Sequence, residues 1–494
     1  MKFDHVTGKC VDLSFEGKGV VKLSYGTVFV DGLFPGEEAE IEIQYKRAGS
    51  YFGKVFRLIK KSPDRIQPKC GVCTACGGCQ LQQLSYPAQL EFKTKKVKDA
   101  FRRQNIENIE VFPCISTEKP YEYRNKIQVP IGRDPHGHIV SGFYRSGTHK
   151  IIPIDKCWIE DPRAGKIILE LKNLMKEFQY APYDEDTRTG LIRHVLIRTS
   201  AHYDEVMVTL VTNKDEFKGK NNFVKEWVKR CPNIKSLIQN INTRDTNVIL
   251  GEKERTLFGP SFIKDSILGA DFLISSKSFF QVNPEQVEKL YRKAIDFANL
   301  DKTENIFDAY CGIGTISLCA SKYVKKVTGV EIVKEAIIDA KKNAKINNIE
   351  NAEFFLGDAG EVFEKLVSNG EKYSTVFVDP PRKGLDQKFI DTLLRLQPKK
   401  IVYVSCDPET LARDVNMLLE KYKIEVVQPV DMFPMTFHCE TVVSLTLRNS
   451  GLNWNNFKIN QKNADKPIIS WYIIVARWFK CVKNYILENS ILKK

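Results

Sequence analysis

A regular alternation of strand and helix patterns, from about residue 275 onward, constrains the fold of this chain more than any other feature of its sequence. Short apolar runs there predict strands that end at five positions, namely Ala309, Glu331, Gly357, Asp379 and Cys406. Helix patterns such as 334–347 and 386–396 separate these runs. The alternation predicts a parallel, doubly wound α/β sheet. Ligands bind outside the carboxyl ends of the strands in such sheets, so the residues after these strands are candidate site residues.

Cys406 follows one of the predicted strands, in the stretch 400–414 (KIVYVSCDPETLARD). The apolar residues 401–404 predict a buried strand, and a charged helix pattern begins at Glu409. A thiol close to a helix N-terminus can become a thiolate at neutral pH. The ordinary alternative is a small buried cysteine without a catalytic role. The choice between the two depends on what lies around Cys406.

A glycine-containing turn at 308–314 (DAYCGIG) follows a strand and opens a helix, which lets backbone approach a ligand closely. Ser317 stands where a dinucleotide fingerprint would have its third glycine, and this weakens a dinucleotide assignment. Glu331 ends the next strand, where it can accept hydrogen bonds from ribose hydroxyls. Asp358 follows the third strand and can receive an adenine amino group. The turn and the two acids together favour S-adenosylmethionine as cofactor.

The sequence Asp379-Pro380-Pro381-Arg382 ends the fourth strand. A DPP sequence followed by an aromatic residue is typical of methyltransferases that act on exocyclic amines of flipped bases. The fourth residue here is Arg382, which argues against amine methylation. Asp379 remains a candidate for cofactor or base binding.

Carbon C5 of a pyrimidine is too weak a nucleophile to accept a methyl group unaided. A thiolate that adds to C6 produces an enolate, C5 then attacks the sulfonium methyl, and a base removes the C5 proton so that the thiol can leave. Cys406 is the candidate thiolate. Glu440, beside His438 and Cys439 and just before a predicted last strand at 442–447, is the candidate base.

Four cysteines lie within residues 69–80, at Cys70, Cys73, Cys76 and Cys79. Such density in an intracellular chain indicates metal ligation. Zinc sites commonly pair two distant CxxC units, whereas closely spaced thiolates around one centre are typical of iron–sulfur proteins. We therefore expect a [4Fe-4S] cluster.

The N-terminal half has a different pattern from the α/β region. Residues 1–62 alternate short β-type runs with glycine-containing turns, which predicts a small barrel of the OB kind. Residues 86–104 predict a basic helix, and β-type runs follow at 126–131, 139–144 and 195–211. Basic and aromatic residues interleave at 121–126 and 142–145. This composition suits RNA, although a solvated sheet face would look the same.

The 494 residues carry a net charge of +14, which suits an anionic partner such as nucleic acid. The first fifteen residues have no signal-peptide core, and no apolar run approaches the ~20 residues that span a bilayer. We therefore expect a cytoplasmic protein without a membrane span, and a monomer. Residues 449–494 form a basic, aromatic C-terminal extension, for which we expect a docked helix.

Five ordered motifs together resemble the bacterial RNA uracil-C5 methyltransferases, and specifically their 23S rRNA branch. The motifs are FFQVN at 279–283, FDAYCGIGT at 307–315, DPPRKG at 379–384, SCDPETLARD at 405–414 and HCETV at 438–442. The resemblance covers residues 1–448. It implies an OB-like RNA-binding TRAM barrel (1–62), a central mixed α+β iron–sulfur domain (63–270) and a class I, Rossmann-like S-adenosylmethionine-dependent methyltransferase domain (271–448).

The resemblance also assigns residue roles. Cys406 would be the nucleophile, Glu440 the proton acceptor, and Phe279 a neighbour of the target base. The cofactor would be bound by Gln281, Tyr310, Glu331, Asp358 and Asp379. The family's cysteine pattern selects Cys70, Cys76, Cys79 and Cys157 as cluster ligands. Cys73 is then spare, although its local spacing would equally allow a four-cysteine ladder.

These observations predict an enzyme that methylates C5 of a uridine in 23S rRNA, in a loop or bulge from which the base is easily flipped. A tRNA uracil-C5 methyltransferase is the alternative enzyme. Cytosine-C5 methylation is disfavoured, because those RNA enzymes employ a second catalytic cysteine and Glu440 would be unexplained. An inactive RNA-binding iron–sulfur protein is the alternative from another class, and the intact pair of Cys406 and Glu440 speaks against it.

Overall fold

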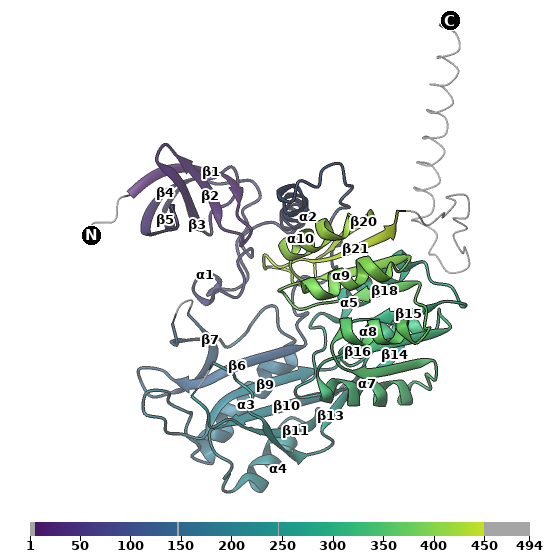
Figure 1. Cartoon of the computed structure of the whole chain (residues 1–494). Coiled ribbons are helices and arrows are strands. Elements are labelled where there is room, and N and C mark those ends of the chain that lie inside the picture. Colours follow the sequence, from purple (N-terminus) through teal and green to yellow (C-terminus); the bar gives the residue numbers. More distant parts are fainter. Residues whose placement is uncertain (1–4, 146–147, 246, 449–494) are drawn as a thin grey trace, which may run out of the picture. The chain divides into compact units, whose positions relative to one another are not determined.

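The computed structural model describes residues 5–145, 148–245 and 247–448, and the predicted C-terminal extension 449–494 lies outside them. Residues Met1–Arg448 form one compact unit (Figure 1). Within the described residues, no helix is both long enough and apolar enough to cross a membrane. The unit is built on a barrel, two seven-stranded sheets and a two-stranded hairpin.

The N-terminal barrel is closed, with strand order β1-β2-β3-β5-β4. Its strands are β1 (His5–Leu13), β2 (Gly19–Leu23), β3 (Gly26–Asp31), β4 (Glu38–Arg47) and β5 (Ser50–Lys60). Alternating residues such as Val28, Val30 and Ile41 point inward and fill the barrel, while their neighbours face outward. The predicted small N-terminal barrel is therefore present, and it has five strands.

A seven-stranded sheet occupies the middle of the chain, in the order β12-β11-β10-β9-β6-β7-β8. Its strands are β6 (Lys126–Arg133), β7 (Ile139–Tyr144), β8 (Ile151–Pro153), β9 (Ile192–Thr199), β10 (Val206–Thr212), β11 (Ile234–Ile241) and β12 (Lys253–Phe258). Helices α3 (Pro162–Glu177) and α4 (Lys220–Arg230) pack on one face, with Leu171 and Trp227 fully buried. The predicted β-type run 195–211 is two strands, because residues 200–205 form a turn between them.

The C-terminal sheet has the order β17-β16-β15-β18-β19-β21-β20. Its strands are β15 (Asn305–Asp308), β16 (Lys326–Glu331), β17 (Ala352–Leu356), β18 (Thr375–Val378), β19 (Lys400–Ser405), β20 (Tyr422–Val430) and β21 (Glu440–Leu447). Strands β15 to β19 are mutually parallel, as predicted. Strand β21 is antiparallel to both neighbours, so the sheet is mixed.

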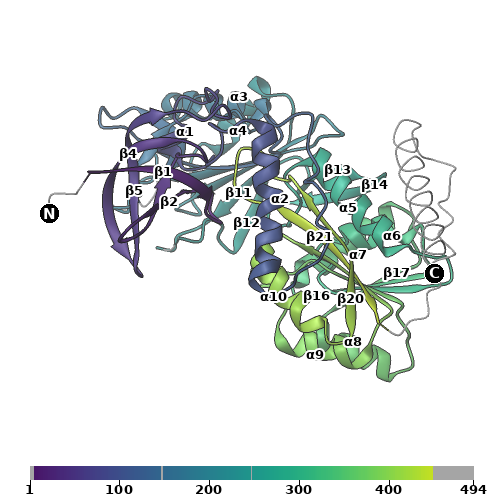
Figure 2. The same cartoon turned by 90° about the horizontal axis from the view of Figure 1, so that it is seen from above.

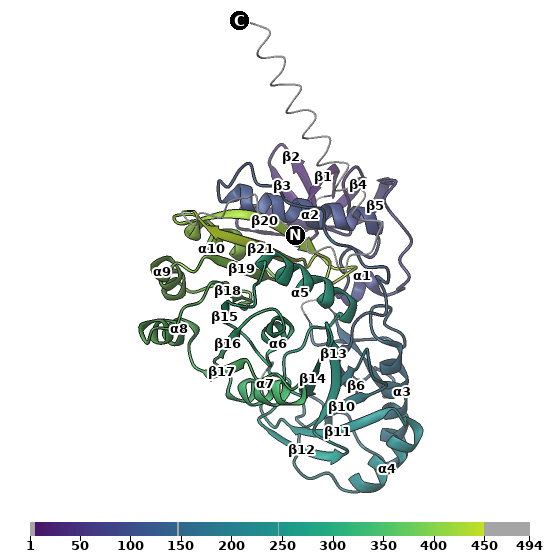
Figure 3. The ribbon, with the colours of Figure 1, turned by 90° about the vertical axis from the view of Figure 1, so that its right-hand side faces the viewer.

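Helices cover both faces of the C-terminal sheet (Figure 3). One face packs against α5 (Pro284–Ala298), α6 (Thr315–Ser321) and α7 (Lys334–Ile346), and α7 also packs on the hairpin of β13 (Phe262–Ile267) and β14 (Ala270–Ser275). The other face packs against α8 (Ala359–Ser368), α9 (Gln387–Leu396) and α10 (Pro408–Leu418). Both faces are thereby removed from water, which explains the near-continuous apolar strands.

Helix α2 (Tyr86–Arg103) belongs to this second layer, although it was predicted within the central domain. Figure 2 shows α2 beside α10, and its residues Val97 and Phe101 share a core with Val427 and Val443 of the sheet. The remaining short helix, α1 (Cys73–Cys76), precedes α2 in the chain. The hydrophobic core of the C-terminal sheet therefore includes residues from both sides of the predicted domain boundary at 270/271. The boundary itself stays a prediction.

A buried ion pair fixes α2 to the segment that precedes Glu440. Lys93 and Asp431 are fully buried, and the Lys93 amine contacts the Asp431 carboxylate directly. The other Asp431 oxygen accepts a hydrogen bond from the Tyr86 hydroxyl at 2.9 Å. Lys93 Nζ also donates to the Phe433 carbonyl at 3.0 Å. Two segments more than 300 residues apart are held together by this network.

Replacing Lys93 by Ala is expected to destabilise the protein by about 3–5 kcal/mol, because the Asp431 carboxylate would remain buried without its counter-charge. Urea unfolding measures the effect as a lower midpoint. Lys98→Ala is the matched control, since Lys98 lies on the same helix but is exposed. Equal midpoints for the two variants would contradict the assignment.

Candidate active site

The candidate site lies at the carboxyl ends of the parallel strands. Strand β15 has β16 on one side and β18 on the other, and the chain changes direction across the sheet between them. Such a switch point is where open α/β sheets bind ligands. Asp308 ends β15, Glu331 ends β16, and Asp379 directly follows β18. These three acids therefore lie at the same edge of the sheet.

The glycine turn after β15 is shaped for a close ligand. Gly312 (φ +54°) and Gly314 (φ +86°) adopt left-handed conformations that favour glycine. A Cβ built on Gly312 would meet no described atom within 4 Å, so space is open beside the backbone. Glu331 braces the turn, because its Oε2 accepts a hydrogen bond from Gly312 N at 3.2 Å and its Oε1 accepts one from Val333 N at 2.9 Å.

Two acids beside the turn hold their protons more tightly than usual. Burial raises the pKa of Asp308 to about 6, although Ser317 Oγ donates to Asp308 Oδ2 at 2.6 Å. Burial, and then the nearby Asp308, raise the pKa of Asp379 to about 7. Asp308 Oδ1 is buried without a hydrogen-bond partner among the described atoms. A buried polar atom without a hydrogen bond costs free energy of folding. This cost indicates that Asp308 Oδ1 has a partner outside the chain.

Tyr291 connects the candidate cofactor residues from the α5 side. Its ring is 1% exposed, and its hydroxyl lies 3.2 Å from Thr315 Oγ1. Burial followed by the charge of Asp379 raises the pKa of the hydroxyl well above the usual range, and the nearby Gln281 side chain opposes this shift. Gln281 and Asp379 therefore lie close to one buried hydroxyl.

Tyr310 and Asp358 occupy the outer part of the site. The Tyr310 ring packs edge-on against Phe389, with 6.0 Å between the ring centres. Asp358 is the N-cap of α8, and its Oδ1 accepts a hydrogen bond from Glu361 N at 3.1 Å. The helix cap occupies Asp358 Oδ1. A contact to adenine would therefore have to use Asp358 Oδ2.

Cys406 and Glu440 start from neighbouring strands. Cys406 follows β19, Glu440 begins β21, and the register pairs Ser405 with Thr441. Cys406 is half-buried and Glu440 is 4% exposed. Burial, and then the charges of Glu440 and Asp379, raise the pKa of the Cys406 thiol to about 12. Burial, followed by Asp379 and Cys439, raises the pKa of Glu440 well above the usual range.

Arg382 is the cation that opposes both shifts. It lowers the pKa of Cys406 and of Glu440, which places its charge near the candidate nucleophile and the candidate base. Its side chain is exposed, and its carbonyl accepts a hydrogen bond from Thr410 Oγ1 of α10 at 3.1 Å. Arg382 thereby stands between strand ends β18 and β19.

The raised pKa of Cys406 predicts a strong pH dependence of its reactivity. Only the thiolate is alkylated, so the rate constant for iodoacetamide should rise about tenfold per pH unit between pH 7 and 9. Peptide mass spectrometry of the 401–413 tryptic fragment measures this rate apart from the other cysteines. A rate that is constant over this range would mean that the thiol is already ionised at pH 7.

Phe279 is held on a loop that the central sheet supports. The ring is 69% exposed, unlike its buried neighbour Phe280. Asn125 donates to the Gln281 carbonyl at 3.3 Å, and its backbone N–H donates to Val282 at 3.0 Å. An exposed aromatic ring on a braced loop can stack on a base.

The candidate cluster cysteines lie in a separate region. Cys79 and Cys157 pack together around Tyr123 and Met435, and the charges of Cys70, Cys73 and Cys76 act on Cys79. Burial comes first among the causes that raise the pKa of Cys79 to about 12. Within the described residues, no group of three or more His, Cys, Asp or Glu side chains is arranged to hold a metal ion. The neighbouring free thiols are therefore suitable metal ligands, but they are not arranged around a common metal position.

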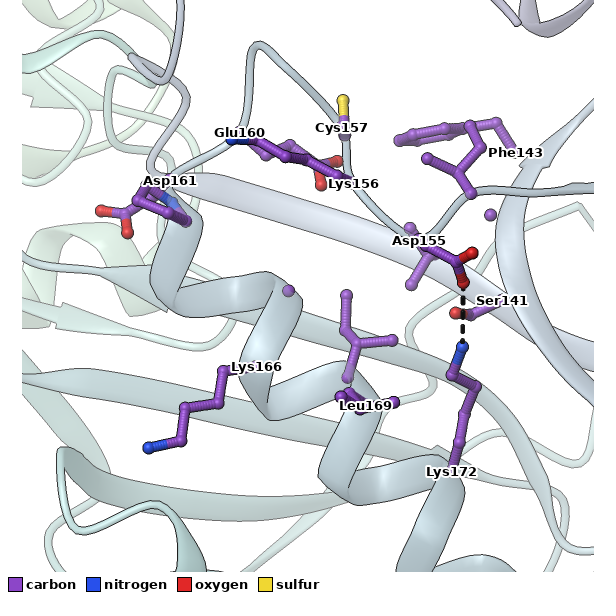
Figure 4. A pocket seen from close by; sticks show the side chains of 16 residues that line it. Ser141, Phe143, Asp155, Lys156, Cys157, Glu160, Asp161, Lys166, Leu169 and Lys172 are labelled. Atoms are coloured by element: carbon purple, nitrogen blue, oxygen red, sulfur yellow. Dashed lines mark ion pairs between the residues drawn. The ribbon is translucent and has the colours of Figure 1, made fainter. Parts of the chain in front are cut away.

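A cavity in the described residues lies beside Cys157, one of the candidate cluster cysteines. It has a volume of about 480 Å³. Figure 4 shows Cys157 and Glu160 at one end and the Asp155–Lys172 ion pair at the other. Glu160 Oε1 has no hydrogen-bond partner there.

The sheet order, the glycine turn and the acids at the switch point define the chain as a class I methyltransferase. A model of the tRNA (Uracil-5-)-methyltransferase family matches residues 85–448. The chain therefore belongs to this family.

Relatives and solved structures agree with this assignment. An uncharacterized RNA methyltransferase of Halalkalibacterium halodurans is 43% identical over 450 residues, which cover 91% of this chain and 98% of that protein. One of Staphylococcus aureus is 43% identical over 448 residues, covering 90% and 99%. The Pyrococcus abyssi tRNA (uracil-54, C5)-methyltransferase, solved with S-adenosyl-L-homocysteine, has a TM-score of 0.73 and 30% identity over 89% of this chain and 100% of that chain.

Proposed function

We propose that the protein transfers the methyl group of S-adenosylmethionine to C5 of a uridine in 23S rRNA. The observation that carries this proposal is the placing of Cys406 and Glu440 on paired strands, beside the glycine turn and the acids of the switch point. Family membership supports uracil C5 as the acceptor, and the ordered motifs support the rRNA branch.

The residues at the switch point fit the cofactor. Open space beside Gly312 and the unpartnered oxygen of Asp308 suit a nucleoside with polar groups. We assign Gln281, Tyr310, Glu331, Asp358 and Asp379 to its binding. The cofactor, when bound, supplies an electrophilic methyl group on sulfur. The Pyrococcus abyssi structure with S-adenosyl-L-homocysteine supports this choice.

The chain's own groups perform the covalent and proton steps. Cys406 gives its proton to solvent and adds to C6 of the uracil, and the electrons of the C5–C6 double bond move into an enolate. C5 would then bond to the methyl carbon, and the bond from that carbon to the sulfonium sulfur would break with its electrons left on sulfur. Glu440 as carboxylate removes the C5 proton, the C5–C6 double bond forms again, and the Cys406 thiolate leaves. Arg382 favours the anionic forms of both groups.

The N-terminal barrel supports RNA as the partner. Tyr45 and Phe56 are more than half exposed. Tyr45 stacks on Phe52 with 4.8 Å between the ring centres, and Lys46 lies 4.8 Å from the centre of the Tyr51 ring. Exposed aromatic rings beside cations are the features that bind single-stranded RNA.

We assign Cys70, Cys76, Cys79 and Cys157 to a [4Fe-4S] cluster. Their soft thiolate chemistry, and the interaction of Cys157 with Cys79, support this set. Anaerobically purified protein should absorb light at about 400 nm and lose this absorbance on oxidation. Cys157→Ala should remove the absorbance, whereas Cys73→Ala should retain it. The opposite result would select the four-cysteine ladder.

A tRNA substrate is the second candidate, because the family description and the Pyrococcus abyssi enzyme both refer to tRNA. Purified protein is incubated with labelled S-adenosylmethionine in two separate reactions, one with unmodified rRNA and one with unmodified tRNA. The labelled nucleoside is then identified in each RNA. We expect 5-methyluridine in 23S rRNA. Label in tRNA alone would select the second candidate, and no transfer to either RNA would contradict both.

A further inference from the structure

Two cations lie directly opposite each other on neighbouring strands of the central sheet. The antiparallel register of β6 and β9 pairs Lys126 with Arg198. Their neighbours Ile127 and Ile197 point to the other face and belong to the core beneath α3 and α4. Because side chains alternate along a strand, Lys126 and Arg198 share the face away from those helices. Like charges directly opposite on paired strands repel.

Neither cation has a carboxylate partner among the described residues. Arg198 is 4% exposed, and its guanidinium donates to the carbonyls of Ser276 and Ser278, while its Nε has no partner. Lys126 is half-buried, and its amine makes no hydrogen bond or ion pair in the described part of the chain. Burial, followed by Arg198 and Arg124, lowers the pKa of Lys126 to about 8.

Glu254 is the carboxylate that hydrogen-bonds the loop of Ser276, and its oxygens already accept hydrogen bonds. Glu254 accepts hydrogen bonds from Ser276 Oγ at 2.9 and 2.7 Å and from Asn240 Nδ2 at 2.9 Å. It does not contribute to the pKa of Arg198, which burial alone lowers to about 10. Buried charge without a counter-charge is costly, so this face of the sheet is complete only with an anion bound.

The position of the pair indicates which anion this is. Arg198 holds the backbone immediately before Phe279, through the carbonyl of Ser278. Asn125, next to Lys126 in the chain, holds the backbone two and three residues after Phe279, through the carbonyls of Gln281 and Val282. The exposed Phe279 ring therefore stands on a loop that is anchored beside the two cations. A base stacked on this ring carries its own phosphate within reach of this face.

We propose that Lys126 and Arg198 form an oxyanion site that binds a backbone phosphate of the substrate RNA next to the target nucleotide. This inference rests on the proposed function in one respect, that RNA is the substrate. The carboxylate of the cofactor is the other source of an oxyanion at this place. A phosphate is favoured because both cations project from the central sheet and border the exposed loop, whereas the candidate cofactor residues other than Gln281 lie at the ends of β15 to β18.

Binding of RNA to Lys126→Gln at several salt concentrations tests the site. The probe is an unmodified 23S rRNA transcript, or a tRNA transcript if that is what the wild-type protein methylates, bound on filters without cofactor. Losing one phosphate contact should reduce the slope of log Kd against log salt by about 0.7–0.9 and weaken binding severalfold at low salt. Lys126→Arg should restore the slope, and Lys225→Gln on the remote helix α4 should leave it unchanged.

Two further readouts make the outcome decisive. The melting temperature of Lys126→Gln should equal or exceed that of the wild type, because the repulsion from Arg198 is relieved. Its Kd for S-adenosyl-L-homocysteine should be unchanged. A weaker Kd for that ligand, with an unchanged salt slope for RNA, would assign the cations to the cofactor and overturn the proposal. An unchanged slope in a variant that binds RNA like the wild type would also overturn it, whereas a wild type that binds no RNA would overturn the proposed function itself.

Discussion

Cys406→Ala is expected to reduce methyl transfer by at least about a thousandfold and to abolish covalent trapping by RNA that contains 5-fluorouridine. The reason is chemical: without a thiolate at C6 there is no enolate, and C5 has no electron density to donate. The half-buried thiol directly follows β19, the strand that pairs with β21 of Glu440, at the edge where the acids of the switch point lie. Transfer of labelled methyl groups and denaturing gels measure the two effects.

Cys231→Ala is the matched control for this variant. Cys231 is also a free cysteine, but it is buried in the core of the central sheet beneath α3 and α4. Its replacement should leave both turnover and trapping close to those of the wild type. Persistent trapping in Cys406→Ala would transfer the role of nucleophile to another cysteine.

Glu440→Gln is expected to lower turnover by about a hundredfold to ten-thousandfold while a covalent protein–RNA complex accumulates with natural RNA. The amide keeps the shape of the side chain but cannot accept the C5 proton. Addition of Cys406 and methyl transfer still proceed, so the reaction stops after the methyl group has moved. Denaturing gels with labelled cofactor should therefore show label on the complex.

Glu425→Gln controls for the change of charge, because Glu425 is a half-buried residue of the neighbouring strand β20 that pairs with Lys423 at 2.9 Å. It should accumulate no complex. If Glu440→Gln lost turnover without accumulating a complex, Glu440 would act before or during the addition step, as a group that positions the base or assists thiol ionisation.

The strand ends were predictable because local chemistry determines them. Each of these apolar runs stops at a polar residue, namely Glu331, Asp379 or Ser405. The predicted end at Glu331 is the observed one, and the ends predicted at Asp379 and Cys406 lie one residue beyond those observed. The carboxyl ends of parallel strands lie at the same edge of a sheet. The sequence alone therefore predicts that Glu331, Asp379 and Cys406 lie near one another.

Other parts of the site depend on contacts between distant segments, which sequence patterns do not contain. Asp308 lies within the glycine motif but was not singled out, because its unpartnered oxygen is evident only in the folded chain. Tyr291 lies on α5, and only the folded chain brings its hydroxyl close to Gln281. The pairing of Lys126 with Arg198 required the strand register. The antiparallel insertion of β21 likewise required the whole sheet.

The central claim is that Cys406 forms the covalent bond to C6 of uracil, and peptide mapping tests it most directly. The wild-type protein is incubated with S-adenosylmethionine and RNA that contains 5-fluorouridine, denatured, and digested with trypsin and nuclease. Mass spectrometry should find a methylated 5-fluorouridine adduct on fragment 401–413, which contains Cys406 as its single cysteine. An adduct on a different fragment, or formation of 5-methyluridine from natural RNA without any adduct, would contradict the account.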